Sequence, residues 1–387
     1  MTADCCFQSP SPASPPPAPT PMLNVIFTLD YEIHGNGDGC PYELMVEPTS
    51  RMMDLFERYG AKLTIMADVA EILKFKEYKE LFGRDDYHYD AIAAQLQDAV
   101  RRGHDVQLHL HASYFNAQHQ NGRWVQDWSE YNFAGLPLAR MTELVRVGKA
   151  YLENLLQPVS PPYRCVAFRA ANWSVNPARN VVRALVHNGI LIETSVFKYG
   201  RREGIVSFDY SQAPSALARW LVGEDDICRP DPDGRLLEIP IYCERRWLGA
   251  FLTANRINRA LQTRAHRIAT GEQGSGGTKP IAKNGWQKLI GQLGMLTTLH
   301  PWKADFNQCT GRQLTGALRR ASRELQSRDQ LECFVLIGHS KLFTQANVKS
   351  LEPFLRFVAD HPEDYQFAVF GGAGLRNSAI TVGHVRG

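Results

Sequence analysis

Asn24-Val-Ile-Phe-Thr-Leu-Asp30-Tyr31-Glu32 is an apolar run that ends in two carboxylates, and runs of this form recur along the chain. Asp105-Val-Gln-Leu-His109-Leu-His111 ends in two histidines, Val166-Ala-Phe-Arg169 ends in an arginine, and Cys333-Phe-Val-Leu-Ile-Gly-His339 ends in a histidine. Continuous apolar runs of this length are typical of parallel strands covered on both faces. In barrels and open sheets of such strands, the chemistry lies where the strands end. The sequence therefore predicts an α/β fold whose polar strand ends converge on one rim.

The strand ends carry the residue types of a metal-assisted hydrolase. Side chains two positions apart on a strand point to the same face, so Asp30 projects with Glu32 and His109 projects with His111. A mixed set of imidazoles and carboxylates with an open position is how catalytic Zn²⁺ is held. Such an ion lowers the pKa of bound water to about 7. A free carboxylate can then act as a base and a distant histidine as an acid.

Each of these residues has an ordinary explanation when it is taken alone. An Asp-x-Glu at a strand end often only caps a turn, and a single His-x-His is a weak metal signal. His339 could be a hydrogen-bonded core histidine, and Arg169 could be an ion-pair partner. Their shared position at the ends of separate apolar runs favours a common site.

The rest of the chain alternates between helical and strand patterns. Residues 1–21 are rich in Pro and Ser, which predicts a disordered tail, and residues 22–387 are predicted to form one barrel domain. Met22 could also be the true start. Helices are predicted at 47–59, 89–102, 138–156, 177–187, 249–266, 286–297, 311–326 and 346–359. An irregular excursion with its own hairpin is predicted at 200–233, and the glycine-rich stretch 271–285 is either a lid or a solvated loop.

The composition excludes some classes of function. The net charge is +3 over 387 residues and there is no dense basic stripe, so a nucleic-acid binder is not expected. No run of about 18 apolar residues predicts a spanning helix. The N-terminus lacks the pattern of a signal peptide, which favours the cytoplasm. The eight cysteines form no Cys-x-x-Cys pair and are expected to be reduced thiols, with a disulfide or two in an exported protein as the alternative.

The order and spacing of these motifs resemble the polysaccharide deacetylases, the NodB-homology group of carbohydrate esterases. The resemblance runs from Leu23 over most of the chain. Thr28-Leu29-Asp30 is similar to the family's Thr-Phe-Asp-Asp, and Gly103-His104-Asp105-Val106-Gln107-Leu108-His109 is similar to its Gly-His-Glu-Ile-Gly-Asn-His. Phe168-Arg169-Ala170, Ile192-Glu193-Thr194-Ser195-Val196 and Leu336-Ile337-Gly338-His339 resemble three later motifs. The resemblance implies a distorted (β/α) barrel of about seven parallel strands.

The resemblance also implies a role for each matching residue. Asp30 takes the place of the catalytic base, Arg169 of the residue that orients it, and His339 of the general acid, while His109 takes the place of a metal ligand. Two departures affect the metal site. Tyr31 stands where the family has an aspartate ligand, and Ser113 stands where it has a second histidine. We infer that Glu32 and His111 replace them.

The expected function is metal-dependent removal of an N-acyl group, in the first place acetyl, from an amino sugar in a glycan or glycan precursor. The expected metal on Glu32, His109 and His111 is Zn²⁺, with Co²⁺, Ni²⁺ or Fe²⁺ as alternatives. The resemblance is to a divergent branch associated with lipopolysaccharide or other surface-glycan synthesis. Two other functions stay open: hydrolysis of a cyclic amide or ureide on the same fold, and glycan binding without catalysis. The oligomeric state has no sequence signal.

Overall fold

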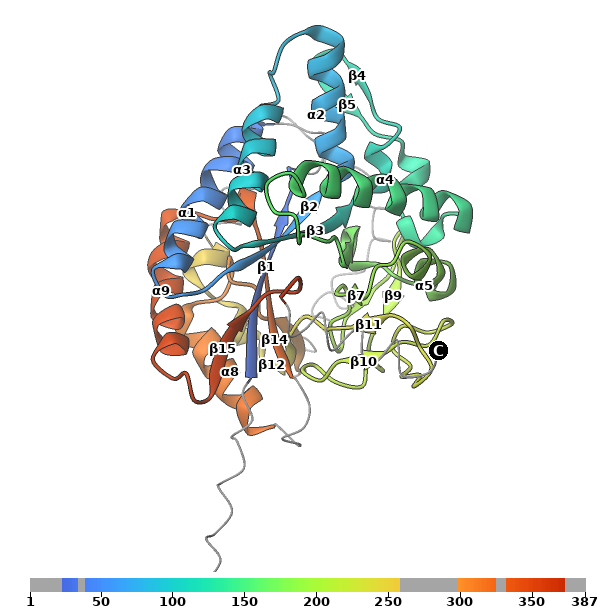
Figure 1. Ribbon diagram of the computed structural model, residues 1–387. Helices are drawn as coiled ribbons and strands as arrows, with labels where there is room; N and C mark the ends of the chain where they lie inside the picture. The colour runs from blue at the N-terminus through green and yellow to red at the C-terminus, as the bar shows by residue number, and fades with distance from the viewer. Residues whose placement is uncertain (1–22, 34–38, 258–297, 325–331, 373–387) are drawn as a thin grey trace, which may run out of the picture.

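The largest sheet of the protein is curled, and it forms about half of a barrel (Figure 1). The computed structural model describes residues 23–33, 39–257, 298–324 and 332–372. Within these residues the sheet has nine strands in the order β10-β11-β7-β6-β3-β2-β1-β14, and β15 also pairs with β1. The strands are β1 Leu23–Tyr31, β2 Leu63–Asp68, β3 Asp105–Leu110, β6 Ala167–Ala170, β7 Ile192–Glu193, β10 Trp220–Leu221, β11 Leu237–Glu238, β14 Cys333–His339 and β15 Tyr365–Ala368.

The central strands form because their apolar residues are covered on both faces. Every residue of β1, β2, β3 and β6 is buried. β1 pairs in parallel with β14 along one edge, and its other edge pairs first with β15 and then with β2. β10 is the antiparallel member, through its pairing with β11. The parallel arrangement directs the carboxyl ends of the central strands to one rim, as the sequence predicted.

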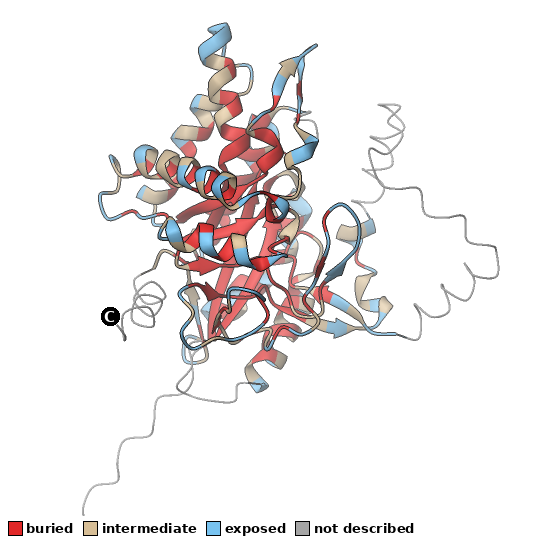
Figure 2. Ribbon diagram, turned by 90° about the vertical axis from the view of Figure 1, so that its right-hand side faces the viewer, coloured by how far each residue is buried: buried red, intermediate tan, exposed pale blue. Residues whose placement is uncertain are grey.

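Helices connect the strands and cover the sheet. They are α1 Glu47–Glu57, α2 Val69–Phe82, α3 Tyr89–Arg101, α4 Leu138–Leu156, α5 Ala178–His187, α8 Gly311–Arg323 and α9 Gln345–Ala359. Figure 1 shows α1 and α9 on one flank of the molecule and α4 and α5 on the other. The helices turn buried residues toward the sheet and exposed residues outward (Figure 2). Among the described helices, none has both the length and the apolar character needed to cross a lipid bilayer.

Short elements complete the described part of the chain. The helical turns are η1 Tyr42–Val46, η2 Ala112–Tyr114, η3 Trp128–Glu130, η4 Phe133–Gly135, η5 Ala171–Trp173, η6 Leu248–Phe251 and η7 Ser340–Leu342. Three two-stranded ribbons are β4 Gln118–Gln120 with β5 Arg123–Val125, β8 Arg201–Arg202 with β9 Phe208–Asp209, and β12 Cys243–Arg246 with β13 His300–Lys303. The β8–β9 ribbon confirms the hairpin that was predicted within the irregular segment 200–233.

The expected distorted barrel of about seven parallel strands is confirmed in part. The fold is barrel-like, but the sheet stays open between β11 and β14. Isolated contacts span this gap among the described residues. They include parallel bridges from Ile241 to Val335 and from Asp305 to Ile337, and an antiparallel bridge from Ala218 to Glu332. The segment after β11 contains Pro240, which cannot donate to a ladder, and this limits continuous pairing at that position.

The structure tests only some of the predicted helices and loops. The helix α2 was not predicted, although it follows β2 directly. In the described part of the predicted helix 249–266, the turn η6 is followed by helical residues 254–257. The tail 1–21, the loop 271–285 and the helix 286–297 lie outside the described residues, as does most of 249–266. Within the described residues, the six cysteines are free thiols: Cys40, Cys165, Cys228, Cys243, Cys309 and Cys333.

Candidate metal and catalytic site

The predicted site residues meet at the carboxyl ends of β14, β1, β3 and β6, with β2 lying between β1 and β3. Asp30 pairs in register with His339 across β1 and β14, and His109 pairs with Arg169 across β3 and β6. Glu32 follows the last residue of β1. Residues this close in register share the same rim of a parallel sheet. The six residues named from the sequence therefore lie in one region, as the pattern of strand ends required.

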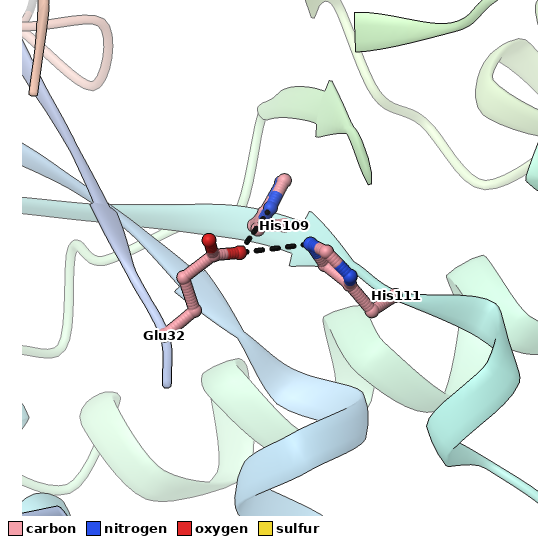
Figure 3. Close-up of side chains that lie close together, drawn as sticks. All are labelled: Glu32, His109 and His111. Atoms are coloured by element: carbon pink, nitrogen blue, oxygen red, sulfur yellow. Dashed lines mark hydrogen bonds and ion pairs between the residues drawn. The ribbon is translucent and has the colours of Figure 1, made fainter. Parts of the chain in front are cut away.

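Glu32, His109 and His111 form a compact ligand set (Figure 3). One ligand atom from each residue lies within 4.8 Å of the others, and all three residues are buried. Glu32 Oε2 lies 3.2 Å from His109 Nε2 and 2.8 Å from His111 Nε2. Figure 3 shows both rings turned toward the Glu32 carboxylate, so the three donor atoms face a common point.

The orientation of His109 fits a metal ligand. His109 Nδ1 lies 2.9 Å from the carbonyl oxygen of Arg169, so a hydrogen on Nδ1 is donated there. With Nδ1 engaged in this way, Nε2 faces the ligand set and is the nitrogen that would bind a metal, as in many protein zinc sites. The main chain of His111 is held as well, because its N–H donates to Asp68 Oδ1 at 3.1 Å. Two imidazoles and one carboxylate are a donor set that suits Zn²⁺.

Lys341 completes the surroundings of Glu32. Its Nζ lies 2.9 Å from Glu32 Oε1 and 2.8 Å from the carbonyl oxygen of Ile33. Burial alone would raise the pKa of Glu32, but the charges of Lys341 and His111 hold it well below its usual value. The carboxylate is therefore ionised, with Oε1 bound to Lys341 and Oε2 facing the two histidines.

Asp30 forms a second buried charge pair beside the ligand set. Arg169 Nη1 lies 2.8 Å from Asp30 Oδ1 and 2.8 Å from Thr28 Oγ1. Arg169 Nε donates to the carbonyl oxygen of Thr194 at 3.0 Å. Burial opposes ionisation of Asp30, but Arg169, with smaller contributions from two histidines, lowers its pKa below the usual value. Asp30 is thus an ionised and oriented carboxylate.

His339 lies on the more exposed side of the site. Its side chain is 16% exposed, and Nε2 is 3.6 Å from Asp30 Oδ2. The backbone N–H of His339 donates to Asn307 Oδ1 at 2.6 Å, and among the described residues Nδ1 has no hydrogen-bond partner. Burial lowers the pKa of His339, although Asp30 acts in the opposite direction. The imidazole is therefore neutral before substrate binds.

Buried acids form a second layer that the sequence did not reveal. Asp68 ends β2, and Glu71 lies one turn into α2 and accepts from the N–H of Ile33 at 2.7 Å. Burial and the neighbouring charge of Asp68 raise the pKa of Glu71 to about 8. Asp68 could have been predicted as a site residue, since it too ends an apolar strand. Glu71 had none, because α2 was not predicted.

Tyr31 and Ser113, the two departures from the motifs that the sequence resembles, are bonded elsewhere and not to the ligand set. Tyr31 Oη donates to Gln95 Oε1 at 2.8 Å, and Ser113 Oγ donates to Gln126 Oε1 at 2.7 Å. The alternation of β1 explains the first case, since neighbouring residues of a strand face opposite sides. The set Glu32, His109 and His111 is therefore the one that the backbone brings together.

The aromatic residues that follow β3 are largely packed into the protein. Tyr114 and Trp124 are buried, whereas Trp128 is 52% exposed. Trp124 lies 5.9 Å from Tyr87 and 5.3 Å from His119 between ring centroids. This arrangement favours a hydrophobic cap over a sugar-stacking groove for most of the segment.

The chain is similar in structure, at low sequence identity, to several proteins of known structure. No protein-family model matches the chain, and no curated protein matches it in sequence. A candidate polysaccharide deacetylase from Mycobacterium smegmatis is 13% identical with a TM-score of 0.47, covering 96% of this chain and 94% of that one. A candidate polysaccharide deacetylase from Pseudomonas aeruginosa PAO1 is 14% identical with a TM-score of 0.44, covering 94% and 92%. An allantoinase is 13% identical with a TM-score of 0.45, covering 96% and 94%.

Proposed function

We propose that this protein hydrolyses an N-acyl group, in the first place acetyl, from an amino sugar in a glycan or glycan precursor. One observation carries the proposal. The ligand set of Glu32, His109 and His111 lies beside the ionised pair of Asp30 and Arg169, and the two carboxylates are two residues apart at the end of β1. A metal site next to a separate base is what hydrolysis of an unreactive amide needs.

A divalent metal, in the first place Zn²⁺, fits the first group of residues. Glu32 would offer Oε2, because Lys341 already binds Oε1. His109 and His111 would offer Nε2. When bound, such an ion polarises the amide carbonyl and makes water more acidic.

Asp30 is the proposed base. Its lowered pKa keeps it ionised, and Arg169 fixes the orientation of its carboxylate. Attack of water forms a C–O bond to the carbonyl carbon, and Asp30 takes the proton that the water loses. Because Oδ1 is bound to Arg169, Oδ2 is the oxygen that faces His339 and receives the proton.

His339 is the proposed acid. The C–N bond can break only if the leaving nitrogen gains a proton, and His339 is the nearest imidazole to Asp30 Oδ2, at 3.6 Å. Since the lowered pKa leaves His339 neutral at the start, it must receive its proton during the reaction. Asp30 holds the proton taken from water and passes it to His339. His339 then gives this proton to the leaving nitrogen as the C–N bond breaks, and Asp30 is ionised again.

The substitution Asp30→Asn tests this assignment. Loss of a general base lowers turnover by about 10²- to 10⁴-fold, while the ligand set is left intact. Acetate release from N-acetylglucosamine oligosaccharides should fall by that amount in the Zn²⁺-loaded variant, with metal content unchanged. Asp209→Asn removes an exposed carboxylate of β9 and serves as the matched control. Wild-type turnover in the metal-loaded Asp30 variant would show that the base is assigned wrongly.

A glycan-binding protein without catalysis is the second candidate, and the pairing of Glu32 favours it. Lys341 neutralises Glu32 from one side, and both histidines contact Glu32 from the other. The buried carboxylate is therefore paired even without an ion. Sugar binding by a metal-free protein that releases no acetate would support this candidate.

A further inference from the structure

Lys303 is a cation that the proposed mechanism does not use. It is the last residue of β13 and is half-buried. Its Nζ lies 3.3 Å from the centroid of the Trp173 ring and 4.4 Å from that of Phe197. Aromatic faces attract a cation, but they accept none of its hydrogen bonds in the usual geometry. The ammonium is therefore held in place with its donors still available.

No residue in the described ranges accepts a hydrogen bond from Lys303 Nζ or forms an ion pair with it. Asp305 is close in sequence, but its oxygens accept from the N–H groups of Asn307 and Gln308 and from the Gln308 side chain. Burial lowers the pKa of Lys303 to about 8, and Asp305 partly opposes this. The side chain remains mostly charged at neutral pH, and a partly desolvated cation without a partner is costly.

The Trp173 ring connects Lys303 with His339, the proposed acid. The Trp173 ring contacts Lys303 and also meets the His339 ring edge-on, with 6.3 Å between centroids. The charge of Asp30 also favours the protonated form of Lys303. Because His339 is the proposed donor to the leaving nitrogen, the sugar half of a bound amide would lie on the side of His339 and Lys303.

The backbone holds Trp173 in this place at a conformational cost. Asn172 and Trp173 have φ of 56° and 57°, in the left-handed region that is unfavourable for residues other than glycine. Tyr210 Oη donates to the carbonyl oxygen of Trp173 at 2.7 Å, and Tyr131 Oη donates to Asn172 Oδ1 at 3.2 Å. Strained residues of this kind cluster at functional sites.

We propose that Lys303, resting on Trp173 and Phe197, binds an anionic substituent of the amino sugar, a carboxylate or a phosphate. The substrate class is then an acidic N-acyl amino sugar. This inference rests on the proposed function, because the position of the sugar half follows from the role of His339. The shared chemistry is an anionic oxygen that accepts hydrogen bonds from the ammonium.

Binding to the variant Asp30→Asn, in which turnover is expected to be slow, tests the inference. The probes are N-acetylglucosamine, its 1-phosphate, its 6-phosphate and the corresponding 6-carboxylate, each titrated by calorimetry. At least one anionic probe should bind about tenfold or more tightly than the neutral sugar. Adding Lys303→Met should remove that difference and leave the neutral sugar unaffected. Comparing the phosphate probes with the carboxylate probe shows which anionic group Lys303 binds.

Lys198→Met is the matched control, because Lys198 also lies near an aromatic ring, 5.6 Å from the centroid of Tyr199, but donates to the carbonyl oxygen of Pro214. It should leave the preference for the anion intact. Equal affinities for charged and neutral probes in the Asp30 variant would overturn the inference, as would a complete absence of anion binding. Equal weakening of all probes by Lys303→Met would show a structural role instead.

The outcomes separate this inference from the proposed function. Lys303-dependent anion binding in a protein that releases no acetate from any probe would retain the binding site and remove the hydrolase. Acetate release without any preference for charge would retain the hydrolase and remove the role of Lys303.

Discussion

Arg169 connects the two halves of the site. Its guanidinium binds Asp30 Oδ1, and its carbonyl oxygen accepts from His109 Nδ1. The side chain is fully buried. A buried charge pair is tolerated while both partners are present, but loss of one partner leaves an uncompensated charge in the interior. Arg169 therefore supports both the orientation of the base and the fold around it.

Arg169→Met should lower the free energy of unfolding by about 3–5 kcal/mol, because Asp30 would remain buried and unpaired. The double variant Asp30→Asn/Arg169→Met should recover part of this loss, since no charge is left behind. Urea unfolding of the wild type, both single variants and the double variant measures the coupling. Additive effects would show that the pair does not act as a unit.

The alternation of strand residues made much of the site predictable. Asp30 and Glu32 project together because they are two apart at the end of β1, and His109 and His111 do so at the end of β3. Lys341 could not be found in this way, because it lies in the turn η7 after β14. Its pairing with Glu32 depends on how that turn folds back, which has no simple sequence pattern.

His104 anchors the junction between β2 and β3 at the end opposite the site. Its Nδ1 accepts from the N–H of Leu63 at 2.9 Å, and its Nε2 lies 3.2 Å from Glu57 Oε1. Only a neutral imidazole can accept at Nδ1. Burial, together with the charge of Lys62, lowers the pKa of His104 to about 4, although Glu57 opposes this. Protonation of Nδ1 would place its N–H against the N–H of Leu63.

The folded protein should therefore lose stability in acid through His104. A pKa lower in the folded than in the unfolded state means that the contribution is complete above the usual pKa of about 6.5 and is lost between there and about 4. The loss between pH 7 and pH 4 is on the order of 3 kcal/mol. His104→Asn keeps an acceptor for Leu63 but cannot be protonated. Urea unfolding at several pH values should show a flatter curve for this variant, and an unchanged slope would contradict the assignment.

Gly338 permits the close approach of β14 to Phe306 and to Asn307, whose side chain accepts from the N–H of His339. A Cβ at this position would collide with the Phe306 ring and lie 2.8 Å from Asn307 Oδ1, the acceptor of the His339 N–H. Gly338→Ala should cost about 1–3 kcal/mol of stability and lower turnover by displacing His339. Gly249→Ala, with no atom within 4 Å of the added Cβ, is the control. Thermal unfolding and acetate release would measure both effects, and equal behaviour of the two variants would refute the prediction.

Some helices could be predicted from the sequence and others could not. The helix α4 has the predicted bounds of 138–156, because an apolar stripe repeats along it and Pro158 follows. The helix α2 begins directly after β2 with no intervening turn, and it buries charged residues such as Glu71 and Lys74 beside apolar ones. That mixture removes the clear division into apolar and polar faces on which the prediction depends.

The curvature of the whole sheet brings the strand ends together, and this property was only partly predictable. The alternation of strands and helices predicted parallel β1, β2, β3 and β6, and these strands provide most of the rim. Closure of the sheet depends on strands that are only two residues long, such as β7 and β11. The apolar residues of such strands do not indicate how far each strand pairs with its neighbours, so an open, curled sheet could not be distinguished from a closed barrel.

The central claim is that the rim holds a metal that serves hydrolysis. The most direct test is the metal content of protein purified without chelators, compared with the variant His109→Ala/His111→Ala. The account predicts a near-stoichiometric divalent ion, in the first place Zn²⁺, in the wild type and its loss in the variant. Absence of metal from the wild type, even after reconstitution with Zn²⁺, would contradict the hydrolytic mechanism and favour a glycan-binding protein.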